Sequence, residues 1–557
     1  MENEVSPKTK YTRAAEERKT HLGNILKSNA RKKVVVAGPG TGKTFLFKEI
    51  LRDKGSCLTL TFVNALVEDL ALELNGLSEV KTLHSFARNL VKQLTKKEIA
   101  IFPKLPEVIE EDALALLKEE VDFNRLFHER DDKNERVEFY RRRKDYYGDY
   151  YGYSDVIFAA VRYLEVHRDR IPSYDQVVVD EFQDFNRLEV SLIDLLSERS
   201  PVLLAGDDDQ ALYDFKSASP EHIRSRYGDK THGYEPFSLP FCSRCPRVVV
   251  EAANDIIDGA IKNGSLQGRI TKPYHYFEDE AKNVVSDDNP TISCGQVYAG
   301  QIPWAIGSQI VKIAARLRAQ FSVLIISPTK TQSHHLTMAL KGKGFERIEH
   351  ADKRGVKEPT LLDGLKLLLT DDEDNLGWRI AAKCLLEEKE FTTLLEKTTL
   401  EGAKHICELL DLEFKKEIKK MLVVLRKIAN DKPIDEDGIA VLKNMELDPF
   451  RIMRDILTEE LDLESLRYGN PAVRKIPIKT TTIESSKGLS ADYVFITHFD
   501  DQYFVKDKKK GLTDKDICNF LVALTRARKK VFLISSRKAE PTFLQWIKKE
   551  RIEPIVR

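Results

Sequence analysis

Short runs of β-branched and other apolar residues recur along the chain and predict buried strands. They lie at 34–36, 58–62, 177–179 and 202–205, and again at 297–298, 323–326, 493–496 and 531–534. Stretches that suit helices separate most of these runs. Strands that are apolar on both faces and alternate with helices are typical of parallel sheets covered by helices. We therefore predict an α/β fold with two parallel-sheet lobes.

Two long stretches interrupt this alternation and predict inserted helical subdomains. Residues 95–150 are highly charged and lack apolar strand runs, and residues 355–474 carry helical patterns such as the leucine-rich segment 361–369. The predicted division follows from these interruptions. It consists of a first lobe at 1–94 plus 151–235 with its insertion at 95–150, and a second lobe at 236–354 plus 475–557 with its reduced insertion at 355–474.

The first strand run leads directly into a glycine-rich loop that predicts phosphate binding. The loop reads Gly38-Pro39-Gly40-Thr41-Gly42-Lys43-Thr44, and a helix-competent segment follows at 45–50. Glycines let backbone N–H groups curl around phosphate oxygens, and the start of a helix adds its positive dipole end. In this context we expect Lys43 to reach the β- and γ-phosphates of ATP and the Thr44 hydroxyl to hold Mg²⁺.

Acidic and amide groups follow the next two buried strands. The run at 177–179 ends in Asp180-Glu181-Phe182-Gln183-Asp184, which suits a Mg²⁺ ligand (Asp180) beside a general base for water (Glu181). The run at 202–205 leads into Gly206-Asp207-Asp208-Asp209-Gln210, which places Gln210 where it could sense the γ-phosphate. A lone capping acid would explain one carboxylate but not this group.

Composition limits the possible partners, cellular compartment and metal sites of the protein. The 557 residues have a formal net charge of +0, so nucleic-acid binding would need local basic patches. We find no secretory signal or membrane-spanning stretch, and the seven cysteines are irregularly spaced, which favours a reducing cytoplasm. Cys242 and Cys245 form a CxxC pair, but a structural zinc site needs four ligands and no second pair is evident.

Taken in order, these motifs resemble the UvrD/Rep/PcrA branch of superfamily 1 helicases. The phosphate loop, the DEFQD segment and the GDDDQxxY segment carry the resemblance first. Further segments in the family's order extend it to the C-terminus: Thr61-Phe62-Val63-Asn64, Thr82-Leu83-His84-Ser85, Ser243-Arg244 with Ala252-Ala253-Asn254, Thr482 to Leu489, and Val522-Ala523-Leu524-Thr525-Arg526-Ala527-Arg528.

The resemblance implies two RecA-like lobes with ATP and Mg²⁺ between them and single-stranded DNA, or its junction with duplex, across them. It assigns Arg244 and Arg526 of the second lobe to the transferring phosphoryl group, although Arg526 taken alone also suits a surface salt bridge. It implies strand contacts from a set of residues in both lobes: Phe62, Asn64, His84, Tyr213, Phe215 and Lys487. Phe62 equally suits a core position, and a lone histidine such as His84 is more often structural.

Several positions depart from the family pattern. No glutamine precedes Gln93, so the family's adenine-reading glutamine is absent upstream of the loop. Glu484 stands where the family has a DNA-facing histidine, and Cys242 stands where it has asparagine. The residues expected for ATP hydrolysis are all present. Because the substituted positions include expected DNA contacts, we expect weaker binding of the DNA strand than in housekeeping helicases. The segment 140–151 mixes arginines with tyrosines and suits either DNA contact or a solvated or partner-binding face.

The resemblance leaves two functions open. One is a motor, for example in DNA repair, that hydrolyses ATP to move 3′ to 5′ on single-stranded DNA and unwinds duplex. The other is a DNA-sensing ATPase subunit that regulates a partner nuclease. Compact UvrD-like helicases of this size occur with OLD-family nucleases in Gabija-type anti-phage defence, and the reduced second insertion fits that use as well as a standalone repair enzyme.

Overall fold

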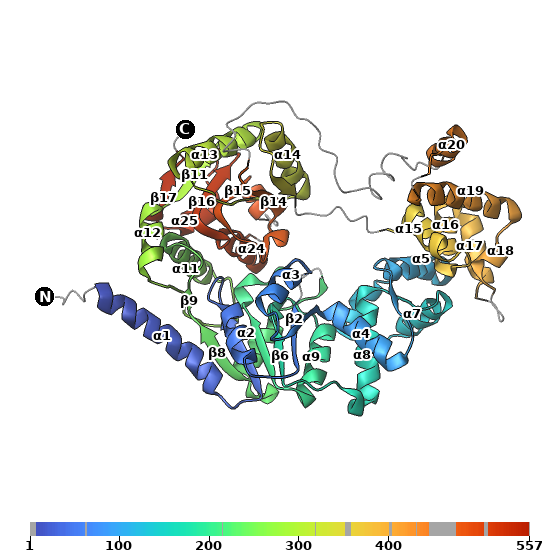
Figure 1. The fold of residues 1–557 in the computed structure, drawn as a ribbon, viewed down its shortest axis with the longest axis horizontal. Coiled ribbons are helices and arrows are strands. Elements are labelled where there is room, and N and C mark those ends of the chain that lie inside the picture. Colours follow the sequence, from blue (N-terminus) through green and yellow to red (C-terminus); the bar gives the residue numbers. More distant parts are fainter. Residues whose placement is uncertain are drawn as a thin grey trace. The chain divides into compact units, whose positions relative to one another are not determined.

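The computed structural model describes residues 7–61, 64–213, 216–317, 319–350, 358–399, 404–430, 432–444, 475–505 and 511–555. The chain divides into two compact units, coloured by sequence in Figure 1. The first unit takes its residues from 1–85, 164–353 and 465–557, and the second from 86–163 and 354–464. The second unit is therefore built from both predicted insertions, and its first part is wider than the predicted 95–150. No helix in the described ranges combines the length and the apolar character needed to cross a membrane.

The first sheet of unit 1 forms lobe 1. Its strand order is β3-β2-β6-β7-β1-β8, and neighbouring strands run parallel. The strands are β1 (Lys32–Ala37), β2 (Cys57–Thr61), β3 (Glu79–Thr82), β6 (Gln176–Val179), β7 (Val202–Gly206) and β8 (Glu235–Leu239). The helices are α1 (Pro7–Lys27), α2 (Lys43–Leu51), α3 (Asn64–Glu73), α9 (Arg187–Arg199) and α10 (Glu221–Gly228). The sheet continues to Leu239, past the predicted boundary at 235, because β8 pairs with β1.

The second sheet of unit 1 forms lobe 2, with the order β13-β14-β12-β15-β16-β11-β17 and parallel neighbours. Its strands are β11 (Ile292–Gln296), β12 (Val323–Ser327), β13 (Ile348–His350), β14 (Ile478–Thr482), β15 (Ala491–Thr497), β16 (Ala527–Ser535) and β17 (Ile552–Pro554). Its helices are α11 (Arg247–Lys262), α12 (Glu280–Asp288), α13 (Ile302–Leu317), α14 (Lys330–Lys341), α23 (Asp501–Phe504), α24 (Asp514–Leu524) and α25 (Thr542–Trp546). A short pair, β9 (Phe241–Cys242) and β10 (His275–Tyr276), lies beside it.

Alternation along the central strand β12 explains how this sheet is covered. Leu324 and Ile326 join the core formed with α11 and α24, whereas Val323 and Ile325 join the core formed with α13 and α14. The parallel α/β architecture predicted for both lobes is thus confirmed. The strand expected at 297–298 was misplaced: the strand is β11, which ends at Gln296, and Tyr298 is 75% exposed. The position of β11 is set by its pairing with β16 and β17. Its partly polar sequence does not predict a strand from local hydrophobicity.

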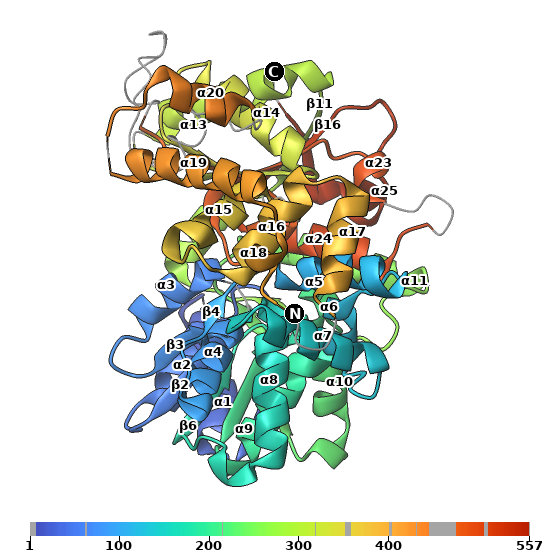
Figure 2. The same cartoon turned by 90° about the vertical axis from the view of Figure 1, so that its right-hand side faces the viewer.

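Unit 2 is helical and combines the two insertions. The first contributes α4 (Leu83–Thr95, mostly in this unit), α5 (Leu105–Leu117), α6 (Phe123–Glu129), α7 (Glu135–Tyr146), α8 (Tyr153–Val166) and the short strands β4 (Ala100–Ile101) and β5 (Tyr150–Tyr151). The second contributes α15 (Leu361–Thr370), α16 (Asn375–Leu385), α17 (Glu388–Lys397), α18 (Ile406–Leu409), α19 (Leu412–Ala429) and α20 (Glu436–Asn444). Helix α17 lies beside α5 (Figure 2).

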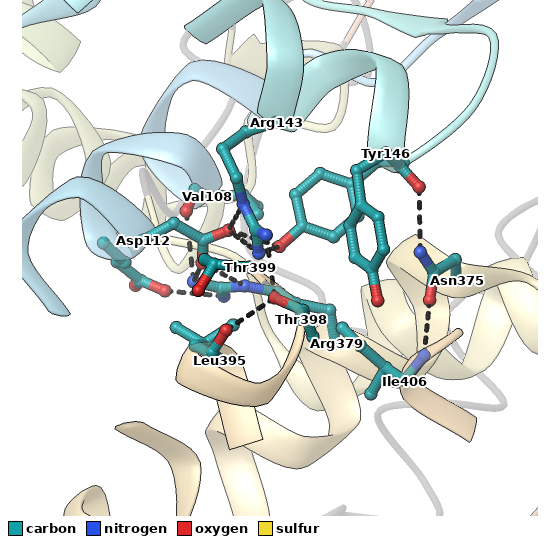
Figure 3. Close-up of polar contacts among 12 residues, drawn as sticks. Val108, Asp112, Arg143, Tyr146, Asn375, Arg379, Leu395, Thr398, Thr399 and Ile406 are labelled. Atoms are coloured by element: carbon teal, nitrogen blue, oxygen red, sulfur yellow. Dashed lines mark hydrogen bonds and ion pairs between the residues drawn. The ribbon is translucent and has the colours of Figure 1, made fainter. Parts of the chain in front are cut away.

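A buried ion network joins the two insertions within unit 2 (Figure 3). Asp112 of α5 accepts hydrogen bonds from Arg143 of α7 at 2.9 and 2.7 Å and from Arg379 of α16 at 3.0 and 2.7 Å. Asp112 and Arg379 have no exposed surface, and Arg143 also donates to Thr398 at 2.9 Å. The middle of the basic, tyrosine-rich stretch at 140–151 is therefore structural, since Tyr147 is buried as well.

Candidate nucleotide site

The phosphate loop lies between β1 and α2, as the sequence predicts. Gly40 and Gly42 have φ angles of +69° and +96°, a left-handed conformation that glycine adopts without strain. Gly42 is the residue that caps α2, and Lys43 and Thr44 begin its first turn. Thr41 donates its hydroxyl to the Gly38 carbonyl at 2.9 Å, which closes the loop. The unpaired N–H groups of the first helical turn therefore border the loop, an arrangement that favours an anion.

Lys43 meets the two acids that follow β6. Its ammonium nitrogen lies 3.1 Å from Asp180 Oδ1 and 2.5 Å from Glu181 Oε1. Burial lowers the pKa of Lys43, but the two carboxylates outweigh burial and raise it above its ordinary value. Lys43 in turn keeps the pKa of the buried Glu181 low, so that this carboxylate stays ionised. Lys43 thus contacts both of the acids with which it is predicted to share the phosphate and metal chemistry.

Glu181 is held by its backbone and by an amide. Its φ of +54° is a left-handed conformation that costs a non-glycine residue free energy, and such strain is concentrated at functional positions. Gln183 donates to Glu181 Oε2 at 2.7 Å and accepts from the Asp207 backbone N–H at 3.0 Å. Gln183 thereby fixes the orientation of the candidate general base and connects it to the loop after β7.

Gln210 connects lobe 1 to an arginine of lobe 2. Its side-chain amide donates to Asp207 Oδ2 at 2.7 Å, and its Oε1 accepts from Arg526 Nη2 at 3.0 Å. Arg526 is 2% exposed and also donates to the Val522 carbonyl at 2.8 Å. Burial, and then the positive charge of Arg244, lower the pKa of the Arg526 guanidinium to about 10. A buried cation that bonds neutral oxygens beside a second cation is well suited to receive an anion.

Arg244 and Tyr274 of lobe 2 lie directly on the phosphate loop. A Cβ atom at Gly40 would come within 2.3 Å of Arg244 Cβ, and one at Gly38 within 2.8 Å of the Tyr274 ring. The Ser243 N–H donates to the Gly40 carbonyl at 2.9 Å, and the Tyr274 hydroxyl donates to the Pro39 carbonyl at 3.0 Å. Both glycines are required here for this close approach.

The residues fit a nucleoside triphosphate with a hard divalent cation. The fit rests on a glycine cradle at a helix start, on Lys43, and on two lobe-2 guanidiniums, which together offer donors to phosphate oxygens. Asp180, with the half-buried Thr44 beginning α2, offers the oxygen ligands that Mg²⁺ prefers. In this structure Lys43 pairs with the carboxylates, so a bound phosphate would have to draw it away.

The acidic loop after β7 forms an ion network that sequence reasoning missed. Lys272 of lobe 2 lies 2.8, 2.5 and 2.8 Å from Asp207, Asp208 and Asp209, and its side chain is 4% exposed. Arg269 adds a contact to Asp209 at 2.8 Å. These three carboxylates lie close enough to hold a metal ion, but here lobe-2 cations neutralise them. The segment at 269–272 carries no distinctive sequence pattern, so its partners could not be foreseen.

The predicted strand-contact residues are placed unevenly. Tyr213 is half-buried and donates its hydroxyl to the Glu484 carbonyl at 3.5 Å, and His84 lies partly exposed in α4. Lys487 is only 3% exposed; it donates to Asp184 and lies 3.4 Å from Glu181. This location is beside the candidate catalytic acids and differs from the strand-facing position expected of it. Asn64 begins α3, but its side chain, Phe62 and Phe215 lie outside the described residues.

Comparison with known proteins identifies one matching family model and several relatives, each of which covers part of the chain. A family model described as an AAA domain matches residues 24–216. The chain is 23% identical over 456 residues to one of the subunits of the ATP-dependent helicase/nuclease of Streptococcus mutans, covering 65% of this chain and 37% of that protein.

Two further relatives are named as helicases. The probable DNA helicase II homolog of Mycoplasma pneumoniae is 23% identical over 397 residues, covering 65% of this chain and 54% of that protein. DNA helicase II of Salmonella typhimurium is 23% identical over 423 residues, covering 66% of this chain and 56% of that protein. The chain thus spans little more than half the length of these relatives, or less.

Proposed function

We propose that the chain is a UvrD-like helicase of superfamily 1 and that it couples ATP hydrolysis to 3′-to-5′ movement along single-stranded DNA. The observation that carries this proposal is the hydrogen bond between Arg526 of lobe 2 and Gln210 of lobe 1, beside the Lys43–Glu181 pair. It supports a nucleotide pocket whose catalytic groups come from both lobes.

Each residue has a defined part in the proposed reaction. Lys43 and the backbone of the phosphate loop bind the phosphates. Thr44 and Asp180 would hold Mg²⁺, which would neutralise phosphate charge. Glu181, held by its hydrogen bond from Gln183, orients the attacking water. It accepts the proton of that water once a bound phosphate has drawn away Lys43, the group that lowers its pKa. Arg244 and Arg526 then stabilise the charge that develops on the transferring phosphoryl group.

Movement follows from the division of these groups between lobes. While the γ-phosphate is present, the lobe-2 arginines have an anionic partner across the interface. When that phosphate leaves, both guanidiniums lose their anionic partner, and the attraction that holds lobe 2 on the phosphate loop weakens. Alternate closing and opening would advance a strand held by both lobes, with Tyr213 as the described aromatic candidate for stacking on a base.

The test compares Arg526→Lys with Arg528→Lys in DNA-stimulated ATPase assays. Arg526 is buried against Gln210, whereas Arg528 is exposed and donates to Ser490 at 2.7 Å. An arginine that stabilises phosphoryl transfer is worth about 10³–10⁵ in rate. We expect a loss in that range for Arg526→Lys and a near-normal rate for Arg528→Lys. Equal rates in the two variants would refute the assignment of Arg526.

Direction and coupling need a second assay with the purified chain. We expect displacement of a strand from a 3′-tailed duplex and none from a 5′-tailed duplex. Strand-stimulated hydrolysis without displacement on either substrate would instead favour the regulatory subunit that gates a partner nuclease. ATP hydrolysis that responds to RNA but not to DNA would contradict the proposed substrate.

A further inference from the structure

Two cysteines flank Arg244 where lobe 2 contacts the phosphate loop. Cys242 ends β9, and Cys245 lies just before α11. Both side chains are fully buried. The Cys245 backbone N–H donates to Cys242 Sγ at 3.4 Å, so the turn brings the second cysteine back onto the first sulfur. A pair of cysteines separated by two residues and followed by a helix is an arrangement in which a disulfide forms readily.

The surroundings give the two sulfurs different chemistry. The ammonium of Lys282 lies against Cys242, donating to its carbonyl at 2.8 Å. Burial raises the pKa of the Cys242 thiol, but the Cys245 thiol, Lys282 and Tyr274 outweigh burial and lower it. The contact between the two cysteines, together with burial, raises the pKa of the Cys245 thiol, which donates to the Thr525 carbonyl at 3.3 Å. One cysteine is thus disposed to be the nucleophilic thiolate and the other to keep its proton.

The pair is also in contact with the nucleotide machinery. A Cβ atom at Gly40 would lie 3.3 Å from Cys242 Sγ, so this sulfur packs against the phosphate loop. A loop of lobe 1 therefore covers this sulfur, and separation of lobe 2 from that loop would uncover it. Within the described residues, neither cysteine belongs to a cluster of three or more potential metal ligands, which argues against a metal site.

We propose that Cys242 and Cys245 are a redox-active dithiol that hydrogen peroxide converts to a disulfide, and that this disulfide inactivates the nucleotide site. The Cys242 thiolate attacks a peroxide oxygen: an S–O bond forms, the O–O bond breaks, and the leaving hydroxide takes up a proton to become water. Cys245 sulfur then attacks Cys242 sulfur. An S–S bond forms, the S–O bond breaks, and the leaving hydroxide takes the Cys245 proton as a second water. The dithiol is oxidised and the peroxide is reduced.

Inactivation follows from the position of Arg244 between the two cysteines. A disulfide needs a sulfur–sulfur distance of about 2.05 Å, which two thiols in contact do not reach, so closing it shifts the turn that carries Cys242 Sγ against Gly40. The intervening Arg244 moves with this turn and loses its alignment over the phosphate loop. This part rests on the proposed ATPase function, and loss of one aligned donor predicts a rate decrease of about 10²-fold. Formation of the disulfide does not depend on that function.

The experiment treats the full chain with hydrogen peroxide and measures both the linkage and the rate. Peptide mapping without reduction is expected to show Cys242 joined to Cys245, with the intact mass lower by two hydrogen atoms. ATP hydrolysis is expected to fall about 10²-fold and to recover with dithiothreitol. Cys242→Ser, which removes the thiolate that peroxide attacks, should abolish the recoverable inactivation, whereas Cys384→Ser, which removes an exposed cysteine, should respond like the parent chain.

Three results would overturn the inference. Mapping that finds Cys242 and Cys245 unlinked in the folded chain after peroxide treatment would refute the dithiol, and it can be measured on the parent chain even where Cys242→Ser does not fold. A complete disulfide with an unchanged ATPase rate would refute the switch. Recoverable inactivation that persists in Cys242→Ser would assign it to another cysteine. A chain that forms the disulfide but hydrolyses no ATP in any state would refute the proposed function and leave the dithiol standing.

Discussion

Replacing Arg379 by methionine should destabilise unit 2 and leave the nucleotide site intact. The Arg379 side chain has no exposed surface, and it donates to Asp112 at 3.0 and 2.7 Å, to Glu111 at 2.7 Å and to the Val108 carbonyl at 3.1 Å. Methionine retains much of the apolar stem but supplies none of these donors. Asp112 keeps its bonds from Arg143 at 2.9 and 2.7 Å, so it loses one of its two cationic partners.

The size of the effect follows from this partial loss. Breaking a buried ion pair by removing one partner costs about 3–5 kcal/mol. Because Arg143 remains, we expect the lower end, about 3 kcal/mol. For a domain of about 150–250 residues, each kcal/mol lowers the melting temperature by about 2–4 °C, which predicts a shift of about 6–12 °C.

Thermal unfolding combined with hydrogen exchange tests this magnitude. Faster exchange should appear in α5, α7 and α16, while the phosphate loop and α2 exchange as before. Arg141→Met is the matched control, since this side chain is 66% exposed and pairs with Glu138 at 3.1 Å; exposed pairs contribute about 0–1 kcal/mol. If Arg379→Met and Arg141→Met unfold at the same temperature, the network does not stabilise unit 2 as argued.

Three further changes test unit 1. Lys272→Met removes the ammonium shared by three buried aspartates and should lower the free energy of unfolding in urea by about 3–5 kcal/mol, whereas the exposed Lys262→Met should not. Burial raises the pKa of Glu189 to about 7, above its unfolded value of about 4.5, so its contribution to stability is complete below pH 4.5 and is lost as the pH rises through 7, a change of about 3 kcal/mol. Glu189→Gln should remove this component, and equal pH slopes in the two proteins between pH 5 and pH 8 would contradict it. Lys487→Met should slow ATP hydrolysis without weakening nucleotide-free binding to single-stranded DNA, because Lys487 contacts Asp184 and Glu181; weaker DNA binding at a normal rate would restore the strand-contact role.

Roles that depend on neighbouring residues could be predicted from the sequence. The phosphate loop, its preceding strand and its helix are contiguous, so the spacing of glycines and Lys43 is enough to define the cradle. The acids after β6 and the amide after β7 follow in the same way, because parallel strands bring their carboxyl ends to one edge of a sheet. The resemblance to a family, in turn, supplied the arginines of lobe 2.

The roles of the other basic residues were decided by tertiary structure alone. Arg143 lies in a charged run that suits a solvated face, yet it is buried, because its partner Asp112 lies on another helix. Lys272 and Lys487 likewise acquire their roles from carboxylates distant in sequence. The local sequence shows that a basic residue is present. The free energy of burying that residue depends on carboxylate partners that only the folded chain brings within a few ångströms. The sequence by itself therefore determined the chemistry of the nucleotide loop, and the fold determined which charges serve it and which hold the molecule together.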